Sequence, residues 1–346
     1  MNHAFKTPVV HAPRLHPARC LRRDWRSESP PPAVCEGTGP VEWTAGTCID
    51  ARDEGPFDPG LQVVRLVRES SAVPGEDRVL ETPIWYPAPR GSGERRADLG
   101  GVVDAAPERN AGPFPIVLFS HGSCGYPGQS RFLLPWLATH GFVVVAPPHP
   151  GNTLAEYPAC GMADAQARSF VERPNDMIFA LDAALALGET SGALLEGVLD
   201  PDRIAMTGHS FGGLTTYLVA EQDFRIDVAI SMAAATTTTS ALSMPSLTLL
   251  GEIDATVSNQ LIREAFDRSN APKLEVTILR TGHFAFSDLC FPSPDCDPPR
   301  TLTQDEAHER VRRWVMPFLQ ATLAGDATFE PFLEPISTDL WTTRTE

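Results

Sequence analysis

Short apolar runs alternate with segments in which apolar residues recur at helical spacing, and this alternation continues through most of the chain. Short apolar runs bounded by turn signals are typical of strands that are buried on both faces. They fall near residues 80–86, 115–119, 142–146, 203–207, 226–231, 246–250 and 274–279. Because strands that alternate with helices form parallel sheets covered on both faces, the pattern predicts an α/β fold with a mostly parallel central sheet.

One helix is predicted over residues 175–187, beginning after Pro174 with Asn175 as its N-cap. Proline is tolerated in the first turn of a helix and usually breaks the interior. Arg173 and Asp176 would then form a local cap or ion pair at this helix start.

The last helix has a capping box, in which Thr303 and Glu306 satisfy each other's backbone N–H groups. The apolar spacing continues past Pro317, which is expected to kink the helix, and Gly325 is expected to end it.

The chemistry of the chain centres on a strand, a sharp turn and a helix. Residues 203–207 lead into Gly-His-Ser-Phe-Gly-Gly at 208–213, with Ser210 at the apex. Such an elbow exposes a serine hydroxyl, and Gly208 and Gly212 let its two arms approach closely. An ordinary strand-to-helix turn would also explain these glycines. Ser210 is therefore a candidate nucleophile whose case depends on its partners.

An acid and a base follow in the expected order. Asp254 lies just past the strand at 246–250, and His283 follows the strand at 274–279. A serine hydroxyl attacks at neutral pH only if an imidazole takes its proton, and that imidazole needs a carboxylate to orient it. Serine, then aspartate, then histidine along the chain is the α/β-hydrolase order, so Ser210, Asp254 and His283 form a candidate triad.

A glycine-bearing loop, residues 120–125, directly follows the strand at 115–119. In such folds this loop supplies one oxyanion-hole amide, and the residue after the nucleophile supplies the other. We assign the donors to the backbone N–H groups of Ser123 and Phe211. His121 is expected to brace the loop. A tight loop without a catalytic role is the alternative.

These motifs resemble the α/β-hydrolase branch that contains dienelactone-hydrolase-like proteins and platelet-activating-factor acetylhydrolases. The resemblance covers about residues 80–325 and implies one α/β-hydrolase domain over residues 33–346. True dienelactone hydrolases use a cysteine nucleophile, whereas residue 210 is serine, so a serine esterase is the better inference. The resemblance is carried by residues 119–122, 208–213 and 282–284, and further by 147–153 and 173–176.

The resemblance also bears on the acid and on the substrate. Glu252 competes with Asp254 for the third triad position, and the Asp-x-x-Val spacing to Val257, seen in related hydrolases, favours Asp254. Polyester-degrading relatives usually carry a tryptophan on the strand after the elbow helix. Residues 226–232 contain none, which lowers the expectation of polyester hydrolysis.

The sequence thus predicts a carboxylic-ester hydrolase of small or short-chain esters that works through an acyl-enzyme without a metal or other cofactor. His149, Phe284 and Phe286 are candidate substrate contacts, although a structural role for His149 is an equal alternative. An acyltransferase, a peptidase or a polyester hydrolase on the same triad stays open. A catalytically silent binding protein is disfavoured because every triad position is filled.

Charge and composition limit the classes of molecule that the protein is expected to bind. A net charge of −16 argues against binding to a nucleic-acid phosphate backbone. No apolar run reaches the roughly eighteen residues of a membrane span. Residues 1–32 are basic and proline-rich without apolar periodicity, so they are predicted to be a disordered segment. They show no signal-peptide core. Export is favoured by the resemblance and the cysteines, and a cytoplasmic location stays open.

Seven cysteines are present, and no Cys-x-x-Cys pair suggests zinc. Two pairs, Cys35 with Cys48 and Cys290 with Cys296, have spacings that suit disulfides in an exported protein. Cys124, beside the oxyanion loop, is a weak alternative nucleophile.

Overall fold

The computed structural model describes residues 42–44, 48–50, 52–236, 242–290 and 301–345. The contact pattern groups residues 32–346 into one unit. Three subjects of the sequence predictions lie outside the described residues: the segment 1–32, Cys35 and Cys296.

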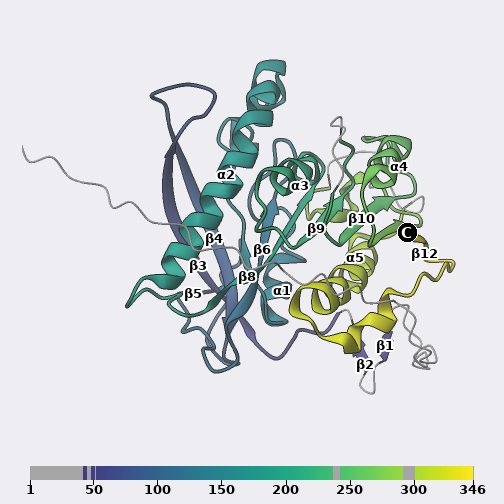
Figure 1. The fold of residues 1–346 in the computed structure, drawn as a ribbon, viewed down its shortest axis with the longest axis horizontal. Coiled ribbons are helices and arrows are strands. Elements are labelled where there is room, and N and C mark those ends of the chain that lie inside the picture. The colour runs from purple at the N-terminus through teal and green to yellow at the C-terminus, as the bar shows by residue number, and fades with distance from the viewer. Residues whose placement is uncertain (1–41, 45–47, 51, 237–241, 291–300, 346) are drawn as a thin grey trace, which may run out of the picture. The chain divides into compact units, whose positions relative to one another are not determined.

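Among the described residues, ten strands form the main sheet, in the order β12-β11-β10-β9-β8-β6-β7-β4-β3-β5 (Figure 1). The strands from β6 to β11 run parallel to their neighbours, and β4 and β12 join them antiparallel. The fold is therefore the predicted α/β-hydrolase arrangement. The sheet strands are β3 (Asp58–Glu69), β4 (Asp77–Ala88), β5 (Val102–Val103), β6 (Phe114–Ser120), β7 (Val143–Val145), β8 (Leu199–His209), β9 (Val228–Met232), β10 (Ser246–Gly251), β11 (Lys273–Ile278) and β12 (Trp341–Thr345). A separate antiparallel pair consists of β1 (Glu42–Thr44) and β2 (Cys48–Asp50).

The central strands bury side chains on both faces. On β6, Val117 and Phe119 pack into one hydrophobic cluster, whereas Ile116 and Leu118 pack into another. Successive side chains of a strand point to opposite faces, so each cluster occupies one side of the sheet. This is why the inner strands read as continuous apolar runs. Strand β3, next to the short edge strand β5, alternates half-buried and exposed positions over much of its length and carries arginines, and for that reason the apolar runs did not reveal it.

Helices cover both faces of the sheet. The helices α1 and α5 pack into the cluster of Val117, and α2 and α3 pack into the cluster of Ile116 (Figure 1). The helices are α1 (Leu134–Thr139), α2 (Ala163–Glu189), α3 (Phe211–Gln222), α4 (Asn259–Arg268) and α5 (Gln304–Leu319). Short 3₁₀ turns occur at η1 (Leu154–Glu156), η2 (Ala159–Gly161), η3 (His283–Phe286) and η6 (Ala327–Leu333), and Gln320–Ala324 (η5) forms one turn of π-helix.

The helix predicted to begin after Pro174 is in fact longer. Helix α2 begins at Ala163, so Pro174 lies in its interior and Asn175 is not a cap. Proline removes one backbone hydrogen bond there. The helix continues because Arg173 and Asp176, on either side of the proline, are fully buried and held by polar contacts with other segments. The predicted local cap or ion pair between these two residues is therefore wrong.

The prediction for the last helix is confirmed at both ends. Thr303 caps α5, and its capping box with Glu306 is complete. Pro317 lies inside α5, the π-helical turn follows, and Gly325 ends it in the left-handed conformation with φ of 76°.

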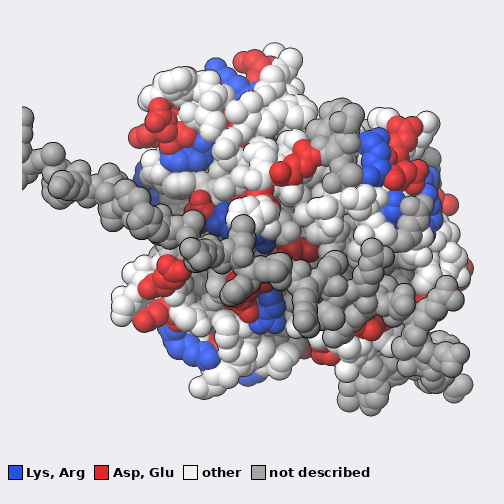
Figure 2. All heavy atoms as spheres, viewed as in Figure 1, with Lys and Arg blue, Asp and Glu red and all other residues white. Residues whose placement is uncertain are grey.

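The viewed surface carries charges of both signs, interspersed without a broad area of either (Figure 2). In the part of the chain that is described, no helix is long and apolar enough to cross a membrane.

Candidate active site

The nucleophile elbow is formed as the sequence predicts. Strand β8 ends at His209, and Ser210 turns the chain into α3 with φ of 57° and ψ of −120°. This left-handed φ is rare for a residue with a side chain and holds the hydroxyl at the apex. A Cβ on Gly212 would lie 1.8 Å from the carbonyl oxygen of Ser120, and one on Gly208 would lie 2.3 Å from the backbone of Gly212. Only glycine fits at either position.

An acid and a base meet at the same edge of the sheet. His283 Nδ1 lies 2.8 Å from Asp254 Oδ2, and their side chains are 3% and 0% exposed. The other carboxylate oxygen of Asp254 accepts hydrogen bonds of 2.8 Å from the N–H groups of Thr256 and Val257. Asp254 is thus fixed by its own turn, and His283 Nδ1–H donates to it. This tautomer leaves His283 Nε2 free to accept a proton.

Glu252, the competing acid, does not contact His283. Its side chain is exposed and accepts a hydrogen bond of 2.8 Å from the N–H of Arg280. It stabilises the loop before His283 from outside.

A buried histidine connects the elbow, the base and the oxyanion loop. His209 Nε2–H donates to the carbonyl of His283 at 3.0 Å, and His209 Nδ1 accepts from Gln129 Nε2 at 3.0 Å. The side-chain oxygen of Gln129 accepts from the N–H of Gly122 at 3.1 Å. Burial lowers the pKa of His209 well below its usual value, so the ring is neutral, with one donor and one acceptor. No sequence pattern singled out His209 or Gln129.

Among the described residues, no hydrogen bond joins Ser210 Oγ to His283. In ligand-free enzymes the bond between nucleophile and base is often long and shortens only when substrate binds. The chain of contacts through His209, the residue before Ser210, holds the two residues near each other.

The oxyanion loop follows β6 directly. Gly125 N–H donates to Gly122 O at 3.1 Å and closes a turn in which Cys124 has φ of 52°. His121 Nδ1–H donates to Gly122 O at 2.8 Å, in keeping with the predicted bracing role. In the described part of the chain, no acceptor occupies the N–H of Ser123 or of Phe211. The first N–H groups of a helix have no partner within it, so the Phe211 N–H is available to a ligand.

Two of the predicted substrate contacts are wrong. His149 is 1% exposed, and its ring nitrogens are occupied by Ser120 Oγ and Asp176 Oδ2, each at 2.9 Å. His149 therefore has the structural role that was the alternative to substrate contact. Phe286 is fully buried in the core. Phe284 is half-buried, and its ring lies edge-on to His283 with centroids 5.4 Å apart.

A disulfide that the sequence analysis missed joins Cys124 to Cys160, with Cα atoms 5.5 Å apart. It ties the oxyanion loop to η2. Because a thiolate is the reactive form of cysteine, the disulfide removes Cys124 as an alternative nucleophile. Cys290 also takes part in a disulfide.

Within the described ranges, no cluster of three or more His, Cys, Asp or Glu side chains could hold a metal ion.

Comparison with known proteins identifies the family of the chain. A family model described as PET hydrolase-like matches residues 100–288. A solved ferulic acid esterase from Streptomyces cinnamoneus has the same fold, with a TM-score of 0.65 and 23% sequence identity over 83% of this chain and 96% of that one. A search among curated proteins found no match. The family model spans more than half of the chain and includes β6, the elbow and the base. The chain therefore belongs to the PET hydrolase-like family of α/β-hydrolases and is a carboxylic ester hydrolase.

Proposed function

We propose that this enzyme hydrolyses esters through a triad of Ser210, His283 and Asp254 and an acyl-enzyme on Ser210. The observation that carries the proposal is the buried hydrogen bond of 2.8 Å between His283 and Asp254, beside an elbow that turns at Ser210. The elbow, the acid and the base follow β8, β10 and β11, whose carboxyl ends lie at one edge of the sheet.

The reaction has two halves. Ser210 Oγ attacks the ester carbonyl carbon while His283 Nε2 takes the hydroxyl proton, and the tetrahedral oxyanion accepts hydrogen bonds from the N–H groups of Ser123 and Phe211. His283 then gives the proton to the leaving alcohol. A water molecule, deprotonated by His283, attacks the acyl-enzyme, and Ser210 recovers its proton as the acid leaves. Asp254 stabilises the imidazolium at each stage.

Small esters are the first candidate substrates, and esters of aromatic acids, including polyesters, are the second. Phe170 is 44% exposed on α2, and its ring centroid lies 5.0 Å from that of Phe211, whose N–H is a proposed oxyanion donor. An aromatic acyl group bound at Ser210 would meet these rings. The family takes its name from PET hydrolases, and PET is a polyester of an aromatic diacid. Strand β9 lacks the tryptophan expected of polyester-degrading relatives, so small esters remain the first candidate substrates.

Replacing the nucleophile gives the direct test. Ser210→Ala is expected to lower kcat for p-nitrophenyl acetate by about a thousand-fold or more, because the covalent step is lost. The thermal midpoint should stay near that of the wild type, since a half-buried hydroxyl is removed. Ser258→Ala, at an exposed serine that makes no capping hydrogen bond, is the matched control. Substantial turnover by a folded Ser210→Ala protein would place the nucleophile elsewhere.

The acid is tested by a pair of isosteric changes. Asp254→Asn should lower kcat strongly, by up to about 10⁴-fold, because the amide favours the wrong tautomer of His283. Glu252→Gln should change kcat by less than about three-fold, since Glu252 bonds only a loop amide and a surface change has a small effect. Equal or reversed losses in the two variants would contradict the assignment of Asp254.

The disulfide at the oxyanion loop generates a third prediction. The double variant Cys124→Ser/Cys160→Ser should lower kcat/KM by about ten-fold, because Ser123 adjoins the freed cysteine. Loss of a cross-link of this span typically costs about 2–4 kcal/mol of stability. Activity should therefore be measured well below the thermal midpoint and expressed per active site titrated with diethyl p-nitrophenyl phosphate. The double variant isolates this disulfide from that of Cys290, which a reductant would also break. An unchanged kcat/KM would show that the cross-link serves stability alone.

Substrate preference is tested at Phe170. Phe170→Ala should lower kcat/KM for p-nitrophenyl benzoate by about two- to ten-fold relative to p-nitrophenyl acetate, the range expected from one aromatic contact. The control is Phe224→Ala, at a phenylalanine that is 96% exposed. If Phe170→Ala leaves the ratio of benzoate to acetate unchanged, the second candidate loses its support.

A further inference from the structure

Arg173 lies beneath the surface at the proposed oxyanion hole and contacts the carbonyl side of its loop. It occupies the middle of α2 and is 0% exposed. Its Nη1 donates to His121 O at 2.6 Å and to Ser120 Oγ at 3.2 Å. Its Nη2 donates to Gly122 O at 3.0 Å and to Asn152 Oδ1 at 2.6 Å. A charged side chain of this size is almost never buried so completely unless its polar groups are paired.

All four acceptors of the guanidinium are uncharged. The pKa of Arg173 is lowered to about 9, chiefly by burial; the charge of Asp176 opposes this shift, and that of Arg78 adds to it. At neutral pH the side chain is still a cation. Its charge therefore acts on the backbone carbonyls of the oxyanion loop instead of on a carboxylate in direct contact.

The key contact is with the peptide group that joins Gly122 to Ser123. Its N–H is the proposed oxyanion donor, and its carbonyl oxygen accepts from Arg173, from His121 Nδ1 at 2.8 Å and from Gly125 N–H at 3.1 Å. Hydrogen bonds to the carbonyl polarise a peptide group, and a cationic donor does so most strongly. The Ser123 N–H is therefore both fixed in direction and made a stronger donor.

The same guanidinium contacts the second donor residue. The central carbon of the Arg173 guanidinium lies 4.5 Å from the centroid of the Phe211 ring, a cation–π distance. One buried cation thus contacts Phe211 and the carbonyl of the peptide group whose N–H belongs to Ser123. Asn152 extends the link, because its amide nitrogen lies 3.4 Å from Ser123 Oγ.

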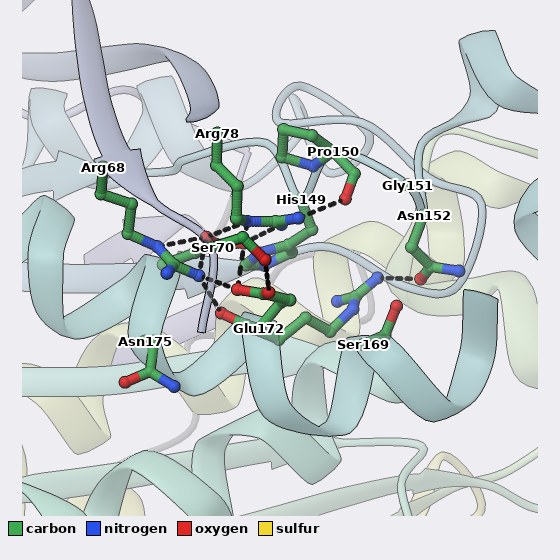
Figure 3. A network of polar contacts seen from close by, with 12 residues as sticks. Arg68, Ser70, Arg78, His149, Pro150, Gly151, Asn152, Ser169, Glu172 and Asn175 are labelled. Carbon is green, nitrogen blue, oxygen red and sulfur yellow. Dashed lines mark hydrogen bonds and ion pairs between the residues drawn. The ribbon is translucent and has the colours of Figure 1, made fainter. Parts of the chain in front are cut away.

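A polar network that includes Arg68, Arg78, His149 and Glu172 adjoins the contacts of Arg173 (Figure 3). Asp176 accepts from Arg68 Nε at 2.8 Å, from Arg78 Nη2 at 2.7 Å and from His149 Nδ1 at 2.9 Å. His149 Nε2 accepts in turn from Ser120 Oγ at 2.9 Å. Glu172 bonds Arg68 and pairs with Arg78, so the two arginines from β3 and β4 are held against α2.

Ser120, His149 and Asp176 have the connectivity of a second Ser-His-Asp triad. All three are buried, with at most 1% exposure, so no ester reaches them. Two arginines neutralise Asp176, and Arg173 also bonds the Ser120 hydroxyl. This chain of bonds anchors the end of β6, from which the oxyanion loop starts.

We propose that Arg173 is a positioning residue for ester hydrolysis, which orients and polarises the Ser123 amide and fixes Phe211 from behind the oxyanion hole. This inference rests on the proposed function. Arg173 does not touch substrate, so its removal should weaken the transition state more than the bound ester.

The test compares two substitutions of Arg173 with a remote control. Arg173→Met keeps the length of the side chain and removes its charge and donors, and Arg173→Lys keeps the charge and loses the planar fork. The control is Arg313→Met on α5, where the guanidinium carbon lies 5.0 Å from the ring of Trp314 in a different part of the core. Diethyl p-nitrophenyl phosphate titrates the competent active sites, so that kcat is expressed per site. Phenylboronic acid, which forms a tetrahedral adduct with a reactive serine, reports on the oxyanion hole.

Arg173→Met should lower kcat per titrated site by about 10- to 100-fold, somewhat less than the loss of one whole oxyanion donor. The inhibition constant of phenylboronic acid should rise by a similar factor, and KM for p-nitrophenyl acetate should stay within about three-fold. Arg173→Lys should lower kcat per titrated site less than Arg173→Met does, but its kcat should stay below that of the wild type. Arg313→Met should lower the thermal midpoint without changing kcat per site.

The outcomes separate this inference from the proposed function. Wild-type enzyme that titrates at Ser210, together with Arg173 variants of normal kcat per site and boronate affinity, overturns the role of Arg173 alone. Wild-type enzyme that does not titrate overturns the proposed function. If Arg173→Met does not fold, Arg173→Lys decides the matter, because wild-type values in that variant contradict the need for a bidentate donor.

Discussion

The candidate site depends on one close approach of two backbones. Gly212, in the first turn of α3, lies so near the carbonyl of Ser120 that a Cβ would come within 1.8 Å of it. This contact brings the end of β6 against the elbow. It sets the distance between Ser210 and the loop that starts at His121. Any side chain at position 212 would have to separate Ser210, the proposed nucleophile, from the proposed oxyanion loop.

Because this contact holds β6 on one side only, the end of β6 needs support on its other side. The end of β6 is held from one side by the elbow, and without support from the other side the loop would be free to shift. His149 and Arg173 provide that support through the Ser120 hydroxyl and the loop carbonyls. Most buried polar groups are paired, and the hydrogen bonds between them make such a network rigid. The end of β6 is therefore packed against the glycine backbone of the elbow on one side and bonded to His149 and Arg173 on the other.

The sheet and the proposed triad could be predicted because their signals are local. Central strands appear as apolar runs, the elbow occupies six consecutive residues, and the acid and base each follow a strand. Asp254 could be favoured over Glu252 only through the Asp-x-x-Val spacing seen in related hydrolases. The structure gives a physical reason for that spacing, because the Val257 N–H donates to Asp254 Oδ1.

The supporting array could not be predicted because its partners are far apart in the sequence. Arg173 bonds a carbonyl 52 residues away, and Arg68 bonds Asp176 across 108 residues. Pro174 misled the helix assignment for the same reason. Local propensity ends a helix at proline, but α2 continues through Pro174, whose neighbours make long-range contacts. The disulfide of Cys124 likewise joins segments that no spacing rule pairs.

An arginine suits the position behind the oxyanion hole for a reason of geometry. The carbonyls of His121 and Gly122 belong to consecutive residues, and one planar guanidinium reaches both with different nitrogens. A lysine ammonium is a compact point charge without that fixed fork. The flat face of the guanidinium also remains available to the Phe211 ring. One side chain can therefore hold both proposed donors of the hole in a fixed relation, through the Gly122 carbonyl on one side and the Phe211 ring on the other.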